Sequence, residues 1–388
     1  MTEAKSTDAY VLYGMQASLY TGKVRAYMRR NRIPVTERGA GHPNYTDKIF
    51  PTMNRFIMPV VVAPDGEIVQ DGTDILDYLE EKGLGHEPLY PEDPALRTVA
   101  HILELFGNEG LLRPAMHYRW NFDDENLEFL KVSFGDVFPA HLDAAGRAAM
   151  FDYASGRMRK AGAAFGVSPD THATIEESYA EFLSLLNAHL KETYYVLGDR
   201  PTIADYGLFN PLYAHLARDP APAHLMKSSA PYVWNWVERM NRPERLEEHT
   251  MDNPPKSLFA ADDLPESLKA LLTYISEEYV AEFTAHVDFA ENWLSEKEGP
   301  LNETDKKTGL GRGLGFAAFN WRGHDIKTVV MLYRFYLAQR LWDHYDGCRH
   351  ADQANIRGLF SSTDLDEFLD KRVARRVIRK DYHEIWET

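Results

Sequence analysis

The stretch at residues 57–80, IMPVVVAPDGEIVQDGTDILDYLE, constrains the fold more than any other part of the sequence. Three valines after Pro59 predict a short buried strand, and the Pro-Asp-Gly at residues 64–66 predicts a turn into a second strand at residues 67–70. A helix is expected from residue 71 onward, because its apolar residues share one face: Ile75, Leu76, Tyr78 and Leu79. Strand, turn, strand and helix therefore follow one another within 24 residues.

Pro59 directly precedes the first of these strands. Proline cannot donate a hydrogen bond to a sheet, so it must lie at the start or edge of the strand. A cis peptide bond can form before it, because the preference of an X-Pro bond for trans is only about 0.5–1 kcal/mol. The Met58 backbone beside such a bond is free to pair with an extended peptide. The helix start at Asp71, Gly72 and Thr73 presents unpaired N–H groups that suit a carboxylate. The two features together fit a small acidic peptide.

Residues 10–38 read as strand, helix and strand, with the helix at residues 18–31. Its basic residues are expected on the outer face: Lys23, Arg25, Arg29 and Arg30. Joined to the hairpin at Pro59, this unit gives the βαβ–ββα order of a thioredoxin-like α/β domain.

These residues resemble a known family. Residues 10–80 are similar to the thioredoxin-like N-terminal domain of the glutathione transferases, and the chain up to about residue 241 follows their two-domain plan. The most specific signal of the second domain is Thr202-Ile203-Ala204-Asp205, a capping box that resembles the one at the buried helix of the family's C-terminal domain. Its role there is in folding.

The resemblance implies three domains in this chain. A thioredoxin-like glutathione-binding domain is expected at residues 8–84 and an all-α domain at residues 94–247, with a Gly/Pro-rich linker between them. Residues 256–388 have no place in an ordinary glutathione transferase and predict an α-helical extension, with helices at 267–298 and 326–344. This extension resembles the tail of some long bacterial glutathione-transferase-like proteins.

The loop before the first helix is where chemistry is expected. Thioredoxin-like proteins place a reactive cysteine there, because the helix dipole lowers the thiol pKa, but residues 15–23 (MQASLYTGK) contain none. The ligand must then supply the thiol, as glutathione does, and the cysteine-type branch of the family is disfavoured. A hydroxyl donor near the sulfur would stabilise the thiolate by about 1.4 kcal/mol for each unit by which the pKa falls.

Ser18 is the best-placed hydroxyl. It stands five residues before Lys23-Val24-Arg25, as the serine does in serine-type glutathione transferases, which implies that Ser18 holds the thiolate. A serine at a helix start can also serve only as a cap. Tyr13 is the alternative, since tyrosine-type transferases use a tyrosine at the end of the first strand, although a tyrosine there also suits core packing.

The glutathione site implied by the resemblance carries over in part. Met58 and Pro59 match the pair whose backbone holds the cysteinyl part of glutathione. Asp71 matches the acidic position at the helix start, but Gly72 stands where the family has a hydroxyl, and Thr73 follows one residue late. The Gly72 N–H can still bind a carboxylate.

The residue that would hold the glycyl carboxylate of glutathione is less well defined. The lysine or glutamine that the family often places two residues before the proline is Ile57 here. Arg55 is the preferred substitute, and Asn54, Lys48 and His42 remain open.

The composition limits which binding partners and which cellular compartment are expected. The 388 residues carry a formal net charge of −16, which argues against nucleic acids and anionic membrane surfaces as main partners. No apolar run approaches the roughly 20 residues of a membrane helix, and the first residues lack a signal-peptide core. The single cysteine, Cys348, excludes an internal disulfide, so a reducing cytoplasm is the simple expectation.

Two features of the extension suggest further roles. His344, Cys348 and His350 have ligand types that suit a metal, but a solvated turn explains them equally, and no metal is expected. The basic run at residues 371–380 (KRVARRVIRK) predicts a helix that pairs with acidic patches of its own chain or of a dimer mate.

The expected function is glutathione-dependent transfer to a small hydrophobic electrophile by a homodimeric enzyme. Conjugation, ether cleavage and dehalogenation use the same thiolate and are not separated by the sequence. The alternative is a non-catalytic binding or assembly protein that uses the extension as its interaction surface.

Overall fold

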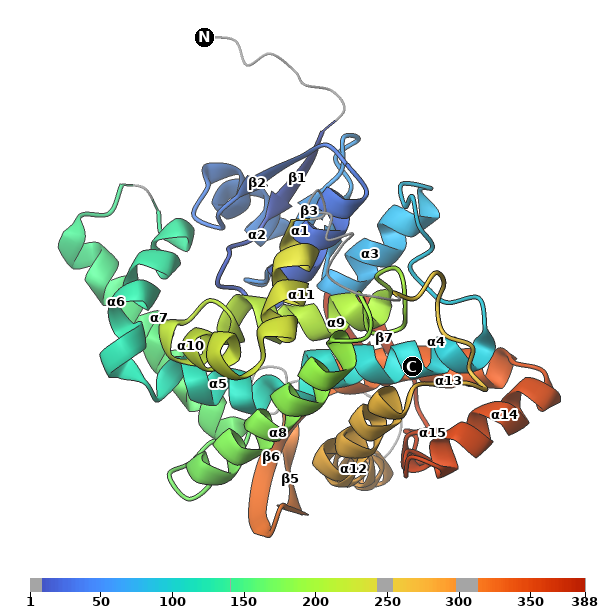
Figure 1. The fold of residues 1–388 in the computed structure, drawn as a ribbon. Coiled ribbons are helices and arrows are strands. Elements are labelled where there is room, and N and C mark those ends of the chain that lie inside the picture. Colours follow the sequence, from blue (N-terminus) through green and yellow to red (C-terminus); the bar gives the residue numbers. More distant parts are fainter. Residues whose placement is uncertain (1–8, 140, 243–253, 298–312, 388) are drawn as a thin grey trace. The chain divides into compact units, whose positions relative to one another are not determined.

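The computed structural model describes residues 9–139, 141–242, 254–297 and 313–387. Figure 1 shows the fold as a ribbon coloured along the sequence. The chain forms two compact units. The first comprises the described residues of Met1–Leu89, Tyr118–Met158 and Phe209–Asp252, and the second those of Tyr90–His117, Arg159–Leu208 and Asn253–Thr388. The domain boundaries expected from the sequence remain a prediction.

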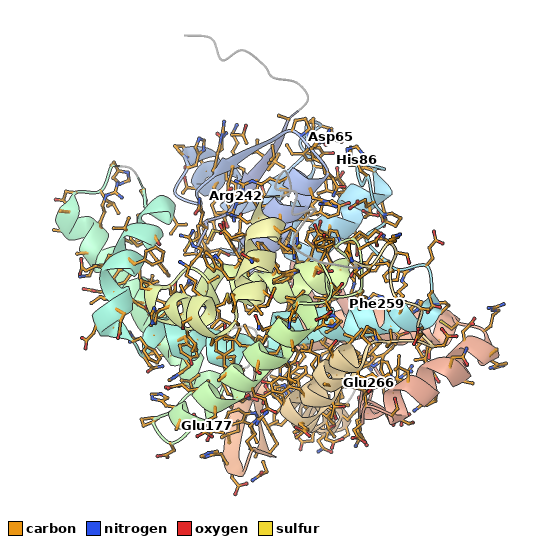
Figure 2. All side chains as sticks on the ribbon, viewed as in Figure 1. Asp65, His86, Glu177, Arg242, Phe259 and Glu266 are labelled. Carbon is orange, nitrogen blue, oxygen red and sulfur yellow. The ribbon has the colours of Figure 1, made fainter. Side chains whose placement is uncertain are left out.

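A four-stranded mixed sheet is the centre of the first unit. Its order is β2-β1-β3-β4, with β1 parallel to β2 and antiparallel to β3, and β3 antiparallel to β4. The strands are β1 (Tyr10–Tyr13), β2 (Val35–Arg38), β3 (Val60–Val62) and β4 (Ile68–Gln70). Asp65, at the turn between β3 and β4, accepts the Glu67 N–H at 3.0 Å (Figure 2). The thioredoxin-like prediction is confirmed.

Three helices of this unit come from the thioredoxin-like segment. They are α1 (Thr21–Arg30), α2 (Phe50–Met53), which follows a π-helical turn at Tyr45–Ile49, and α3 (Gly72–Glu81). Helix α1 packs against α3. The prediction that Lys23 and Arg25 lie on an outer face is wrong, because both are buried, and Arg25 forms a salt bridge with Glu37.

Helical segments complete the first unit. They are α6 (Asp123–Phe134), a 3₁₀ turn (Gly135–Val137), a π-helical turn (Leu212–Leu216), α10 (Pro220–Ser229) and α11 (Pro231–Asn241). Helix α11 packs on α1, and its Trp236 is fully buried. Three helices continue from one unit into the other: α5 (Leu112–Trp120), α7 (Ala144–Ala164) and α9 (Ile203–Pro211).

The second unit is built mainly of helices. They are α4 (Pro94–Leu105), continued by a π-helical turn (Phe106–Gly110), then α8 (His172–Leu190), α12 (Glu266–Ser295), α13 (Leu332–Gly347), α14 (His350–Ser361) and α15 (Glu367–Asp370). Helix α12 packs against α8, and α13 and α14 pack against α4. The predicted helical extension is thus confirmed and folds within the second unit.

The predicted capping box lies at the start of α9. One carboxylate oxygen of Asp205 accepts the Thr202 N–H at 2.9 Å, and the other accepts the Val196 N–H, also at 2.9 Å. Both side chains are fully buried. Asp205 therefore satisfies the first turn of α9 and the preceding loop together.

The extension also contains two antiparallel hairpins that the sequence analysis missed. They pair β5 (Gly313–Trp321) with β6 (His324–Met331), and β7 (Val377–Lys380) with β8 (His383–Trp386). The predicted helix at 326–344 is wrong up to Met331 and begins only at Leu332. The signal was a two-residue turn, Arg322-Gly323, whose positive φ angles of 45° and 86° suit a tight hairpin.

The basic run at residues 371–380 is not the predicted helix. It ends in strand β7. Its predicted pairing with acidic groups of the same chain is confirmed, since Arg372 lies 2.7 Å from Asp346 and Arg376 lies 2.6 Å from Asp343.

No helix among the described residues has the length and apolar character needed to cross a membrane.

Candidate functional site

The Met58–Pro59 peptide bond is cis and leads into β3. The preceding residue is fixed by Tyr45, whose buried hydroxyl donates to the Ile57 carbonyl at 2.6 Å and accepts the Ile57 N–H at 3.0 Å. Met58 is half-buried, and its backbone N–H and carbonyl have no hydrogen-bond partner among the residues described. Its backbone is thus available to an extended ligand.

The start of α3 is capped by its own side chain. Asp71, with a φ of 76°, accepts the Thr73 N–H at 2.9 Å and the Asp74 N–H at 3.4 Å. The Thr73 N–H, expected to be unpaired, is therefore occupied. The Gly72 N–H remains the backbone donor here that the Asp71 side chain does not use.

Lys23 supplies a buried positive charge at the same place. Its ammonium donates to the Thr73 hydroxyl at 2.8 Å, and its backbone N–H donates to Asn210 at 3.2 Å. Lys23 is fully buried, and Thr73 is 1% exposed. The Thr73 hydroxyl thus already accepts an internal hydrogen bond. Lys23 could not be assigned to this site from the sequence, where its neighbours suggested an exposed basic face.

Ser18 lies in a turn before α1. Its N–H donates to the Met15 carbonyl at 3.2 Å, and its carbonyl accepts the Thr21 N–H at 3.3 Å. The alternative that Ser18 caps the helix is wrong, because α1 begins at Thr21 and Tyr20 holds the cap position. The Ser18 side chain is half-buried, and its hydroxyl forms no hydrogen bond within the described part of the chain.

The other hydroxyls near this loop are less accessible. Tyr13 is 2% exposed, and its ring packs against His42 at 6.2 Å and Tyr45 at 5.7 Å between centroids. Thr21 is fully buried against Gly14. Of the Tyr13, Ser18 and Thr21 hydroxyls, that of Ser18 is therefore the one that a ligand reaches most easily.

Arg55 is 9% exposed and lies near Tyr45. Burial raises the pKa of the Tyr45 hydroxyl, and the positive charge of Arg55 partly counters that rise. The charge of Arg55 therefore lies near Tyr45, whose hydroxyl fixes Ile57.

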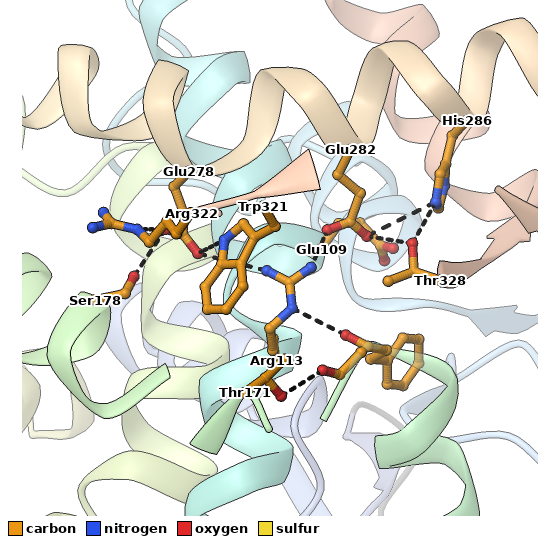
Figure 3. Close-up of polar contacts among 12 residues, drawn as sticks. Glu109, Arg113, Thr171, Ser178, Glu278, Glu282, His286, Trp321, Arg322 and Thr328 are labelled. Atoms are coloured by element: carbon orange, nitrogen blue, oxygen red, sulfur yellow. Dashed lines mark hydrogen bonds and ion pairs between the residues drawn. The ribbon is translucent and has the colours of Figure 1, made fainter. Parts of the chain in front are cut away.

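A second group of polar residues lies inside the second unit (Figure 3). Helix α12 turns Glu278, Glu282 and His286 inward at intervals of four residues. Arg113 donates to Glu282 at 2.6 Å and Arg334 at 3.0 Å, and these two cations lower the Glu282 pKa to about 2 against the effect of burial.

The other two carboxylates of this group are also paired with arginine. Glu278 accepts from the Trp321 ring N–H, Ser178 and Arg322, each at 2.8 Å. Glu109 lies 3.3 Å from Arg334. Carboxylates that are held by this many donors stabilise the packing of α12 and do not act as free acids or bases.

The His344 region is held by protein contacts. Nε2 of His344 donates to the Pro94 carbonyl at 2.9 Å, and the Cys348 thiol donates to the His344 carbonyl at 3.1 Å. Burial lowers the pKa of His344 and raises that of Cys348. Within the described residues, no group of three histidine, cysteine or acidic side chains is arranged to hold a metal ion.

Comparison with known families gives two matches. Residues 12–85 match the family model of the glutathione S-transferase N-terminal domain, and residues 169–239 match that of the C-terminal domain. No curated protein matches the sequence.

Solved structures with similarity to this chain include several glutathione transferases. A glutathione S-transferase from Methylobacterium radiotolerans in complex with glutathione sulfonate is 20% identical over 66% of this chain and 100% of its own, with a TM-score of 0.36. The β-etherase LigF from Sphingobium sp. is 17% identical over 60% and 94%, with a TM-score of 0.42. FzlA from C. crescentus is 16% identical over 64% and 96%, with a TM-score of 0.38. Similarity at this level adds nothing to the two family matches.

Proposed function

Because residues 12–85 and 169–239 make this chain a member of the glutathione S-transferase family, we propose that it is a glutathione-dependent transferase. Ser18 stabilises the thiolate of bound glutathione, and the thiolate attacks a small hydrophobic electrophile. The observation that carries the proposal is the half-buried Ser18 hydroxyl, which has no hydrogen-bond partner in the described residues and stands just before α1.

The electrostatics of this position favour a thiolate. The N-terminus of α1 carries partial positive charge, and a hydroxyl that donates to sulfur stabilises the charged form over the thiol. In the transfer step the sulfur forms a bond to an electrophilic carbon, and the leaving group departs with the electron pair. Tyr13 is the second candidate for the donor, although its burial makes it less accessible.

The remaining contacts follow from the same segment. Met58 pairs through its backbone with the cysteinyl part of glutathione, and the Gly72 N–H binds the γ-glutamyl carboxylate beside Asp71. Arg55 balances the glycyl carboxylate. The Met58 backbone, which has no hydrogen-bond partner among the described residues, supports this arrangement.

Two wider features belong to the same proposal. The enzyme acts as a homodimer in the cytoplasm, in line with its family and with its single cysteine. Its electrophile is hydrophobic, and conjugation, ether cleavage and dehalogenation are the candidate reactions.

A second candidate is a non-catalytic binding or assembly protein that acts through the extension. Gly72 supplies no hydroxyl at the helix start, and the Thr73 hydroxyl, which accepts from Lys23, belongs to a side chain that is only 1% exposed. These two features favour weaker glutathione binding than a full site would give.

The test is glutathione binding by calorimetry with the ultraviolet absorbance of the thiolate followed against pH. We expect the wild type to lower the thiol pKa, Ser18→Ala to bind glutathione without lowering it, and Tyr13→Phe to behave as the wild type. Binding with an unshifted pKa in the wild type removes Ser18 from this role. Absence of binding at millimolar glutathione favours the second candidate.

A further inference from the structure

We propose that Arg119 is a positioning residue that fixes the Ser18 loop for thiolate stabilisation. The proposal rests on the proposed function, because it assigns Arg119 a role through Ser18. Arg119 touches neither sulfur nor electrophile, and it lies 101 positions from Ser18 in the sequence. Nothing in the sequence links the two.

Arg119 is itself held rigidly in the first unit. Its Nε donates to one oxygen of Asp219 at 2.6 Å, and its Nη2 donates to the other at 2.9 Å. Arg119 is 2% exposed and Asp219 is fully buried. A buried, bidentate pair of this kind fixes the plane of the guanidinium.

Asp219 is committed to this pair. It occupies the N-cap position of α10 but makes no capping hydrogen bond with its side chain. An aspartate at this position would ordinarily cap the helix, which stabilises it by about 1 kcal/mol. Here the carboxylate holds Arg119 in place.

The other donors of Arg119 reach two backbone carbonyls. Nη1 donates to Ala17 at 2.7 Å, and Nη2 also donates to Ala214 at 2.6 Å. The Ala17 carbonyl belongs to the peptide bond that carries the Ser18 nitrogen. By holding this oxygen, Arg119 fixes the plane of that peptide and so the direction in which Ser18 leaves the backbone.

The rest of the loop is held less firmly. Within residues 14–21, the backbone hydrogen bonds run from Gly14 to Arg38 and over the two short turns at Ser18, at 3.0–3.3 Å. Arg218 also reaches the loop, through Gln16 at 2.7 Å, but that contact is exposed. A buried charged donor contributes more than such neutral or exposed contacts.

The consequence concerns the thiolate rather than affinity. The contacts proposed for glutathione at Met58 and Gly72 do not involve Arg119. A loosened Ser18 loop should therefore lower the thiolate fraction of bound glutathione, with little change in the dissociation constant. A displacement of catalytic geometry by about 1 Å is enough to cost a large part of such stabilisation.

The experiment compares Arg119→Lys with the wild type in two measurements. Hydrogen exchange should become faster in the peptide that covers residues 14–22, and the pKa of bound glutathione should rise by about one unit, which is about a tenfold loss of thiolate near neutral pH. Arg113→Lys is the matched control, because Arg113 is equally buried but holds α12 in the second unit. It should change neither reading.

The outcomes separate the two proposals. Unchanged exchange at residues 14–22 in Arg119→Lys overturns the positioning role. If exchange is faster in Arg119→Lys but the wild type does not lower the thiol pKa, Arg119 positions the loop and the proposed function is rejected. If Arg119→Lys does not fold, Asp219→Asn keeps the shape of the pair and weakens it, and the same two measurements apply. Restored readings in Asp219→Glu would support the charge pair as the cause.

Discussion

Nη1 of Arg334 lies 2.5 Å from Nδ1 of His286 in the second unit, and both side chains are buried. Because a guanidinium can only donate, Nδ1 must be the unprotonated nitrogen. Nε2 therefore carries the proton and donates to Thr328 at 2.7 Å. The neutral tautomer of His286 is thus set by its neighbours, with Glu282 and Arg113 as the other charged groups that face it.

This contact predicts acid sensitivity. Burial first, and the charge of Arg334 second, lower the pKa of His286 well below its usual value of 6.5. Below pH 6.5 the unfolded chain binds a proton at His286 that the folded chain does not, so the free energy of unfolding falls as the pH falls, by at most about 1.4 kcal/mol per pH unit. We expect the free energy of unfolding, measured in urea, to fall less steeply from pH 7.5 to 5.5 in His286→Gln than in the wild type. Parallel slopes in the two proteins would contradict the assignment.

Glu282→Gln should be strongly destabilising. The carboxylate lies between Arg113 and Arg334, and its removal leaves two buried guanidinium groups without their shared partner. Breaking a buried pair in this way costs about 3–5 kcal/mol. The midpoint of thermal unfolding measures the loss. Glu128→Gln is the control, since its pair with Lys131 is exposed and should matter little.

The thioredoxin-like half of the fold could be predicted because its signals are local. Pro59 and the turn at residues 64–66 set the hairpin, and the spacing of apolar residues set α3. The sequence also located the loop with Ser18. Its prediction for Lys23 failed because burial of a lysine depends on a partner 50 residues away, Thr73, which no local pattern reveals.

The second unit was harder to predict for the same reason. Arg334 and Glu109 are 225 positions apart, so the charged group around α12 exists only in the folded chain. Strand β6 was read as part of a helix because apolar residues such as Val329 and Val330 are consecutive, and a run of this kind suits either structure.

Gly207→Ala should destabilise the second unit. A Cβ at Gly207 would lie 2.5 Å from the Cα of Glu104, and one at Gly107 would lie 2.4 Å from the carbonyl carbon of Gly207. The close contacts at this crossing of α9 with α4 and its π-helical turn are between backbone atoms, so an added Cβ could be accommodated only by moving a helix backbone. A loss of about 1–3 kcal/mol is expected for such overpacking.

Gly358→Ala is the matched control for this crossing. Gly358 lies inside α14, and its Cβ would meet nothing within 4 Å. Alanine should therefore stabilise the helix by about 0.5–1 kcal/mol. Thermal unfolding that moves in opposite directions for the two variants would support the close approach at Gly207, and a stabilising Gly207→Ala would refute it.

Gly72→Ser should strengthen glutathione binding. A Cβ at Gly72 would lie 3.4 Å from Lys23 Cδ and 3.5 Å from the Tyr20 carbonyl, which are ordinary contacts, so the helix start accepts a side chain. The serine hydroxyl would add a hydrogen bond to the carboxylate that we assign to the Gly72 N–H. A net gain of about 0.5–1.5 kcal/mol, or roughly two- to twelvefold in affinity, is expected. Calorimetry on Gly72→Ser and Gly72→Ala separates the hydroxyl from the added Cβ, because only the serine should bind more tightly. Equal affinities in the two variants would place the carboxylate elsewhere.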